Sequence, residues 1–245
     1  SMVYVLRVQS ALAKLAALEN ADGSWSWYPK MPGNDYITAQ NVLRLSRLQN
    51  LAGEQTAAPM AARGFAFLKK SLANAVKEMK EYEGVSHTSA NPAVPSRLWL
   101  QVVYLYAVRG EKLDENARFV LERCAEQAGS SDLYAKSLAA IALKSDGQDA
   151  KASALLESLS EYTVGNAAIG RFFDSARAPM CAASYRIPTQ AIAIEALSTA
   201  PEYAVLVDEM RLWLMQSKRT QMWDTSIATA DALYSLLAAP SAKAD

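Results

Sequence analysis

Residues 20–48 read NADGSWSWYPKMPGNDYITAQNVLRLSRL. The first half is a loop rich in tryptophan, glycine and proline, and the second half repeats apolar residues every three or four positions, which is the period of an α-helix. Thr38 stands near the start of that helical segment, where its hydroxyl could accept a hydrogen bond from a free backbone amide. The stretch therefore predicts an aromatic loop, a threonine N-cap and an apolar helix in succession.

The same succession occurs twice more in the chain. Residues 188–200 read PTQAIAIEALSTA and residues 228–240 read ATADALYSLLAAP, each with a threonine followed by a small, apolar run. The last copy follows a loop that carries Trp223, and the middle copy follows a loop with phenylalanine and tyrosine in its place. A repeated supersecondary unit of this kind indicates helical hairpins stacked around an axis.

Helical periodicity extends over almost the whole chain. The first apolar face consists of Val5, Leu12, Leu15 and Leu18. Further helices are predicted at 37–48, 58–82, 97–108, 114–127, 132–143, 149–159, 188–198, 203–216 and 226–238. No stretch shows the strict alternation of a half-buried strand. We predict an all-α fold in a single domain over residues 1–245, with side chains buried near its axis at Leu43, Ile192, Ile194, Leu197, Leu233 and Leu236.

Composition excludes several classes of function. The 25 basic residues balance the 25 acidic ones, so we expect no nucleic-acid partner, which would need a basic face. No apolar run is long enough to span a bilayer, and we expect no direct membrane insertion. Cys124 and Cys181 stand in unlike surroundings and predict neither a disulfide framework nor a redox state. One histidine and two scattered cysteines cannot supply the three or four ligands of a zinc site without help from carboxylates, and we expect no metal or other cofactor.

Three segments resemble the complement-like, thioester-type domain of bacterial alpha-2-macroglobulin family proteins. Residues 20–48 are similar to its DG-S-[WF] loop and the T-A-x-V-L helix that follows. Residues 130–159, SSDLYAKSLAAIALKSDGQDAKASALLESL, resemble a later hairpin with a tyrosine-containing cap. Residues 208–237, DEMRLWLMQSKRTQMWDTSIATADALYSLL, resemble the closing pair of helices. The three segments follow one another in the order that the family has.

The resemblance implies both a fold and a function. The fold would be an α/α toroid of helical hairpins, terpenoid cyclase-like, that lacks some of the first hairpins at its N-terminal end. The function would be that of a non-catalytic domain in a periplasmic or cell-envelope proteinase inhibitor or trap. Its partners would be the neighbouring β-sandwich domains of the parent chain and proteinases, and it would act by non-covalent docking.

The tetrapeptide Cys124-Ala125-Glu126-Gln127 has the C-x-E-Q pattern from which relatives of this family build an internal thioester. In those relatives it precedes the DG-S-W loop, whereas here it follows long after that loop. The residues around it predict an ordinary helix that Leu113 opens, with Gly129 at its C-cap and Ser130 and Ser131 capping the next helix. The resemblance therefore implies a branch of the family without a functional thioester, and we expect Cys124 to be a free thiol on a helix.

His87 is the only histidine, and it lies in the loop EGVSHTSANPAVPS. Thioester-bearing relatives use a histidine in a loop of this neighbourhood to relay the acyl group. Without a thioester there is nothing to relay, and we expect a solvated loop side chain. The lysines of residues 69–80 alternate with glutamates and indicate the solvent-exposed face of a helix.

A carbohydrate-active toroid enzyme, a glycosidase or lyase, is the alternative function. Such enzymes use paired acids in an aromatic groove. Suitable residue types are present near Trp25 and Trp223, namely Asp22, Trp27, Asp35 and Asp224. The simpler interpretation is that the aspartates are turn and helix-cap residues and that the tryptophans close hairpin ends by packing. We favour this interpretation and predict no catalytic residues.

Overall fold

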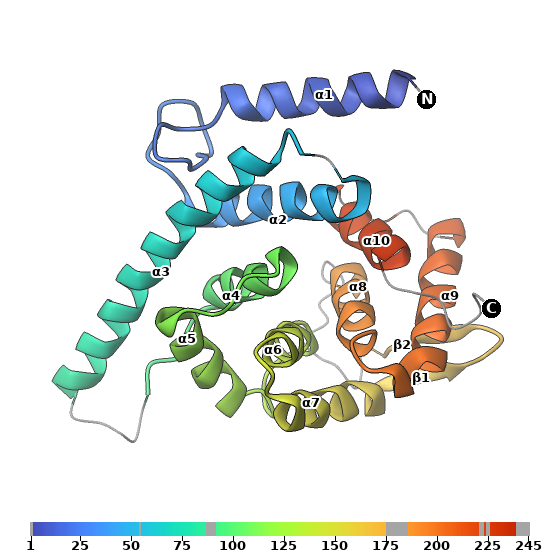
Figure 1. Ribbon diagram of the computed structural model, residues 1–245. Helices are drawn as coiled ribbons and strands as arrows, with labels where there is room; N and C mark the ends of the chain where they lie inside the picture. Colours follow the sequence, from blue (N-terminus) through green and yellow to red (C-terminus); the bar gives the residue numbers. More distant parts are fainter. Residues whose placement is uncertain are drawn as a thin grey trace. The chain divides into compact units, whose positions relative to one another are not determined.

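The structure is a computed structural model that describes residues 2–53, 55–86, 92–174, 186–220, 223 and 226–238 (Figure 1). The chain divides into two compact units, Ser1–Val120 and Leu121–Asp245. The prediction of an all-α protein is confirmed, because helices account for most of the described residues. None of the helices in this part of the chain combines the length and the apolar character that crossing a lipid bilayer requires.

The predicted helix positions agree closely with the observed ones. The first unit contains α1 (Met2–Ala17), α2 (Asp35–Ala52), α3 (Ala58–Ser86), α4 (Arg97–Arg109) and the start of α5 (Glu115–Glu126). The second unit contains α6 (Leu133–Ser145), α7 (Asp149–Glu161), α8 (Arg186–Leu197), the 3-10 turn η2 (Pro201–Tyr203), α9 (Ala204–Thr220) and α10 (Ser226–Ala238).

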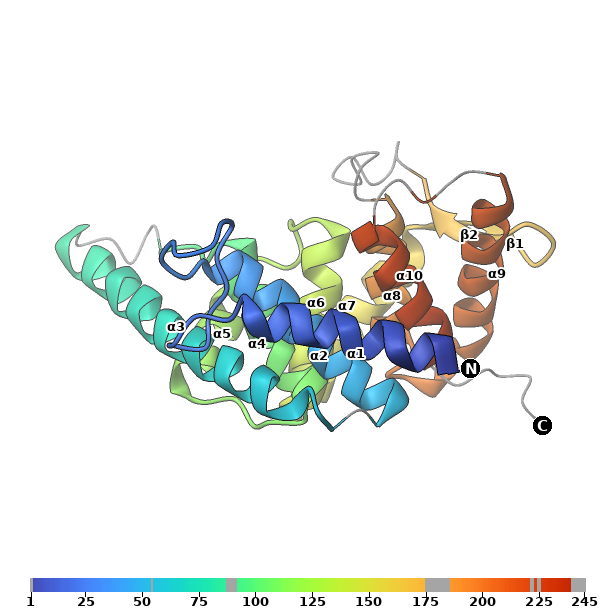
Figure 2. The same cartoon turned by 90° about the horizontal axis from the view of Figure 1, so that it is seen from above.

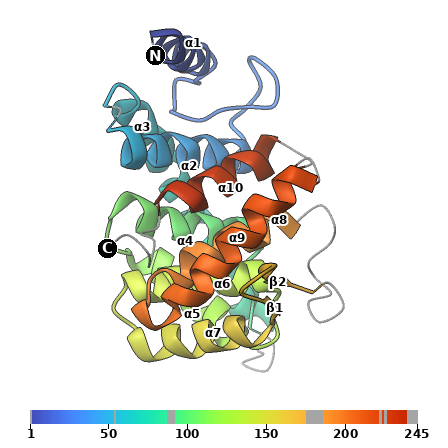
Figure 3. The same cartoon turned by 90° about the vertical axis from the view of Figure 1, so that its right-hand side faces the viewer.

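The second unit also contains a β-hairpin, and the prediction that the chain has no strands is wrong here. Strands β1 (Thr163–Asn166) and β2 (Gly170–Phe173) pair antiparallel, and β2 packs beside α9 (Figures 2 and 3). Gly170 has a φ of 81°, and a Cβ at this position would lie 2.5 Å from the backbone nitrogen of Trp213. Two four-residue strands with a glycine in each are too short to show an alternating pattern, so no strand signal is visible in the sequence.

The predicted threonine N-caps are also corrected. Thr38, Thr189 and Thr229 are each the fourth residue of their helix, one turn inside α2, α8 and α10. The N-cap of α2 is Asn34, whose side-chain oxygen accepts a hydrogen bond from the Ile37 amide at 3.0 Å. The repeated threonine therefore marks an equivalent position in three helices, although it does not cap them.

In the first unit α2 packs against α3 and α4. Gly64 permits the close approach of α2 and α3, because a Cβ on it would lie 2.6 Å from Cγ2 of Val42 and 2.9 Å from the Trp25 ring. The rings of Phe65 on α3 and Tyr106 on α4 meet edge to face, with centroids 4.9 Å apart. The first unit is thus held together around side chains from α2, α3 and α4.

In the second unit α8 is the central helix and contacts α6, α7, α9, α10 and β2. The predicted burial of Ile192, Ile194 and Leu197 on this helix is confirmed. The side-chain amide of Gln190 donates to the carbonyl oxygens of Arg171 at 2.9 Å and Met210 at 3.2 Å, which links α8 to β2 and α9. A buried amide with its hydrogen bonds made fixes the position of the three elements.

The other predicted core residues lie nearer the surface. Leu43 and Leu236 are half-buried and Leu233 is exposed. The reason is that α10 turns Ala228, Ala232 and Ser235 inward, so Leu233 projects from another side of the helix. The apolar face predicted for α1 is likewise not buried as expected, since Val5 and Leu18 are exposed and Leu12 and Leu15 are half-buried.

Replacing Gly64 with alanine should destabilise the first unit by about 1–3 kcal/mol, because the added methyl group would overlap Val42 and Trp25. Gly84 lies on the same helix with nothing within 4 Å of its would-be Cβ. Gly84→Ala should therefore stabilise the helix, by about 0.5–1 kcal/mol. Urea denaturation of the two variants, followed by circular dichroism, checks that the two substitutions change the free energy of unfolding in opposite directions. A Gly64→Ala variant as stable as the parent would contradict the tight crossing.

Candidate functional site

The loop between α1 and α2, residues 18–34, is the candidate site, and we call it the aromatic loop. Its anchor is Trp25, which is only 2% exposed. The indole Nε1 donates to the carbonyl oxygen of Leu15 at 2.9 Å, and the backbone nitrogen donates to Oγ1 of Thr38 at 3.0 Å. The carbonyl oxygen of Trp25 accepts from the Asn34 amide at 2.8 Å. Trp25 therefore fixes the loop to α1 and α2, and its predicted packing role is confirmed.

Short-range hydrogen bonds fix the rest of the loop. The side-chain amide of Asn20 donates to the hydroxyl of Ser26 at 2.8 Å, and that hydroxyl donates to the carbonyl oxygen of Met31 at 2.6 Å. Gly23, with a φ of 86°, lies so close to α3 that a Cβ would be 2.7 Å from the carbonyl oxygen of Arg63. The backbone is consequently held in one conformation on both sides of the aromatic residues.

The tip of the loop projects apolar side chains into solvent. Trp27 is 63% exposed, Tyr28 is 70% exposed and Met31 is 51% exposed. The Trp27 ring stacks on Tyr36, with centroids 6.3 Å apart and 18° between the ring planes. The prediction that Trp27 packs inside a hairpin end is wrong. The exposure of Tyr28 and Met31 was also not predicted from the sequence. The only sign of their exposure in the sequence is the proline that follows each of them.

The two aspartates of this region serve local structure. Oδ1 of Asp22 accepts hydrogen bonds from the backbone nitrogen of Ser24 at 3.0 Å and from its hydroxyl at 2.5 Å. The hydrogen bond from the Ser24 side chain lowers the pKa of Asp22 below its usual value. A general acid needs a raised pKa, so Asp22 is unsuited to that role. Asp35 is the first residue of α2, where a negative charge complements the helix dipole.

The other residues of the predicted acid-and-tryptophan group belong to the second unit. Trp223 is half-buried, with Nε1 donating to the Ser217 hydroxyl at 3.5 Å and the Lys218 ammonium 4.9 Å from the ring centroid. It therefore lies against the end of α9, as a packing residue would. Asp224 lies outside the described residues, and so do His87 and Cys181.

Cys124, Ala125 and Glu126 form the end of α5, as predicted, and Gln127 follows in a turn, so the helix ends before the predicted C-cap at Gly129. Cys124 lies in the last helical turn as a free thiol, and the Gln127 amide donates to its carbonyl oxygen at 3.3 Å. Burial raises the pKa of the Cys124 thiol to about 11. The predicted capping by Ser130 and Ser131 is wrong, because the carboxylate of Asp132 accepts from the Ala135 amide at 2.8 Å and caps α6.

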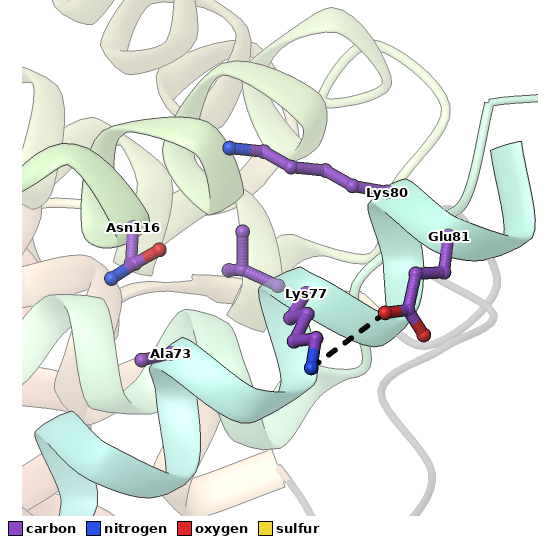
Figure 4. A pocket seen from close by; sticks show the side chains of 6 residues that line it. Ala73, Lys77, Lys80, Glu81 and Asn116 are labelled. Atoms are coloured by element: carbon purple, nitrogen blue, oxygen red, sulfur yellow. Dashed lines mark ion pairs between the residues drawn. The ribbon is translucent and has the colours of Figure 1, made fainter. Parts of the chain in front are cut away.

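Figure 4 shows an open hollow of about 420 Å³ between α3 and the start of α5. Its lining residues are Ala73, Val76, Lys77, Lys80, Glu81 and Asn116. Each ammonium has a carboxylate nearby, since Lys77 lies 3.8 Å from Glu81 and Lys80 lies 3.9 Å from Glu115. The lysine side chains are largely exposed. The hollow is therefore part of a solvated helix face, as the charge pattern predicted.

A second hollow, of about 390 Å³, lies in the second unit beside the C-x-E-Q tetrapeptide. It is lined by Glu122, Ala125, Glu126, Leu143, Lys151, Ala154 and Leu155. Cys124 is not among these residues, so the thiol does not open into the hollow. No cluster of side chains suited to a metal ion occurs within the described residues.

One buried amine was not predicted. Lys136 on α6 is 2% exposed, and its ammonium donates to the Ser158 hydroxyl at 2.8 Å and lies 5.2 Å from the Tyr162 ring centroid. Burial lowers the pKa of Lys136, and the negative charge of Glu161 opposes that shift. The hydroxyl and the ring satisfy the ammonium from two sides, which explains how a lysine is tolerated in this position.

No protein-family model and no curated protein sequence matches the chain. The geometry offers a rigid loop with a displayed aromatic tip on the first unit. Within this loop, Asp22 is held in a turn by its hydrogen bond with Ser24.

Trp25→Ala should destabilise the first unit by about 3–5 kcal/mol, because it removes a buried indole and its hydrogen bond. Trp27→Ala should change the free energy of unfolding by less than about 0.5 kcal/mol, because the side chain is exposed. Chemical denaturation of both variants, followed by circular dichroism, compares their free energies of unfolding. Equal losses of stability would show that the two tryptophans have been assigned the wrong roles.

The thiol of Cys124 should react slowly with iodoacetamide. With a pKa of about 11, only about one molecule in a thousand carries the reactive thiolate at pH 8, and the rate should rise about tenfold per pH unit up to about pH 11. The measurement uses a Cys181→Ser variant, so that mass spectrometry follows Cys124 alone. The same protein in denaturant is the control and should react about a hundredfold faster at pH 8. Rapid labelling of the folded protein would contradict the burial.

Proposed function

We propose that this chain is a non-catalytic docking domain of a bacterial alpha-2-macroglobulin-like proteinase inhibitor or trap, from the branch without a thioester. Its helices would form part of an α/α toroid. Two observations support this: the order of the three resembling segments, and the equivalent threonine position in α2, α8 and α10. The neighbouring β-sandwich domains of a parent chain and a proteinase are the proposed partners, at the cell envelope.

The observation that carries the proposal is the display of Trp27, Tyr28 and Met31 on a loop whose base is fixed. Tryptophan, tyrosine and methionine are enriched at protein–protein interfaces, and large aromatic side chains supply most of the binding energy there. Because Trp25 and Ser26 already hold the backbone, little conformational entropy would be lost on binding. The tip thus has the composition and the rigidity of a docking surface.

The surroundings of Cys124 support a non-covalent mode of action. A thioester domain has to present its cysteine and glutamine as one reactive group. Cys124 instead packs in the last turn of α5, with its thiol pKa raised, and Gln127 stands in the following turn. We therefore expect that methylamine, which opens thioesters, leaves the intact mass of the protein unchanged.

A carbohydrate-binding or carbohydrate-active protein is the second candidate function. The observation that favours it is the flat, exposed ring of Trp27 stacked on Tyr36, since sugars bind to such aromatic platforms. From the sequence, the acid pair of such an enzyme is expected near Trp25 and Trp223. The burial of Trp25 removes it as a sugar platform, so the alternative now depends on Trp27 and Tyr28.

The test is binding of the chain to trypsin, chymotrypsin and elastase, measured by sedimentation velocity. A complex that dissociates in sodium dodecyl sulfate is expected, and Trp27→Ala combined with Tyr28→Ala should weaken it by about tenfold or more. Tyr82→Ala is the matched control, because Tyr82 is an equally exposed tyrosine on α3. It should bind as the parent does.

Two results would contradict the proposal. A mass increase with methylamine would reveal a thioester. Release of reducing sugar from a panel of polysaccharides, abolished by Trp27→Ala, would establish the carbohydrate function instead. Failure to bind any of the three proteinases would remove them as partners of this domain.

A further inference from the structure

Helix α1 buries none of its side chains. Each of the other α-helices that the structure describes buries at least one. Figures 1 and 3 show α1 at the outer edge of the first unit. A helix of this length is marginally stable in water without packing, and Val3, Val5 and Val8 lower its intrinsic propensity further. The helix therefore lacks the packing that its sequence needs.

Most side chains of α1 fall into three groups around the helix. Val8, Leu12 and Leu15 are half-buried, and the carbonyl oxygen of Leu15 accepts the hydrogen bond from Trp25. Arg7, Ser10 and Lys14 follow at helical spacing on another side, with the exposed Val3 among them, and Tyr4 and Ala11 are exposed next to the half-buried group. Every residue of the third group is exposed, and this group consists of Met2, Val5, Leu6, Gln9, Ala13, Ala16 and Ala17.

We call this third group the open face of α1. It carries no charge, and its only polar side chain is Gln9, near the middle of the helix. The large residues Met2, Val5 and Leu6 lie at one end of the face, and the small residues Ala13, Ala16 and Ala17 lie at the other. Monomeric soluble proteins rarely expose a contiguous apolar surface along a whole helix.

We propose that the open face of α1 is an interface with α1 of a second copy of this chain, paired antiparallel. Antiparallel pairing places the large end of one helix against the alanine end of the other, so that side chains fill the space that the alanines leave. The same pairing brings Gln9 of the two copies together at the two-fold axis, where each amide can donate to and accept from the other. A face with large side chains at one end and small side chains at the other is complementary to the same face of a second copy only when the two helices run antiparallel.

Two other occupants fit the open face less well. A helix that lies on a membrane surface usually has a strongly charged polar face, whereas α1 has two cations and no acid along its length. An acidic partner helix would need cations within the contact, but Arg7 and Lys14 lie on another side of the helix and not on the open face. The absence of charge from the open face favours a partner that is equally uncharged, such as α1 itself.

Sedimentation velocity from low to high micromolar concentration tests the pairing. The parent should convert from monomer to dimer, and Leu6→Glu should weaken the dimer by at least about tenfold, because it places a charge in the contact. Val205→Glu is the control, because Val205 is an exposed apolar residue on α9 in the other unit. That variant should dimerise normally. Circular dichroism confirms that both variants are folded.

Cross-linking tests the orientation. Met2→Cys and Ala17→Cys are introduced separately into a chain in which Cys124 and Cys181 are replaced by alanine. On mixing and mild oxidation, antiparallel helices should give the mixed disulfide between the two variants in preference to either homodimer. Gln9→Cys alone should form a disulfide homodimer.

Any of four results would overturn the proposal. These are a parent that stays monomeric at every concentration, a dimer that Leu6→Glu leaves intact, preferential homodimers of Met2→Cys, and binding to phosphatidylglycerol vesicles without self-association. The interface is independent of the docking proposed for the aromatic loop. The Trp27→Ala and Tyr28→Ala double variant should therefore dimerise as the parent does, which separates a failure of one proposal from a failure of the other.

Discussion

The burial of the Trp25 side chain is the interaction on which the first unit depends. Its indole nitrogen donates to the carbonyl oxygen of Leu15 at the end of α1, and its backbone is tied to Thr38 on α2. Its ring lies so close to Gly64 on α3 that no side chain would fit between them. One residue therefore joins three helices and, through them, sets the direction in which the following loop leaves the core.

The position of the aromatic tip follows from that anchor. With Trp25 fixed and Ser26 bonded to the carbonyl oxygen of Met31, the intervening residues have to project outward. Trp27 and Tyr28 thus remain exposed to solvent, although large aromatic side chains would also suit a core. The two tryptophans, only two positions apart, therefore differ sharply in exposure, because Trp25 packs in the core and Trp27 lies at the surface.

The second unit relies on buried polar groups in a similar way. Gln190 joins α8 to β2 and α9 through two carbonyl oxygens, and Lys136 is held between the Ser158 hydroxyl and the Tyr162 ring. Such groups are tolerated in a core only when their hydrogen bonds are made, so they specify one arrangement of the helices around them.

The sequence by itself determined the helical class and the position of nearly every helix, because the 3.6-residue period is a local property of the chain. It also identified the end of α5 at Cys124 as an ordinary helix terminus. Only the tertiary structure decided that Trp25 is buried while Trp27 is exposed, that Thr38 bonds to a loop instead of capping α2, and that the apolar side of α1 remains open. These features depend on which distant segments come into contact, and residue type and periodicity carry no information about such contacts. The short β-hairpin was missed for the same reason, since Gly170 is required by its closeness to Trp213 and not by any pattern in β2 itself.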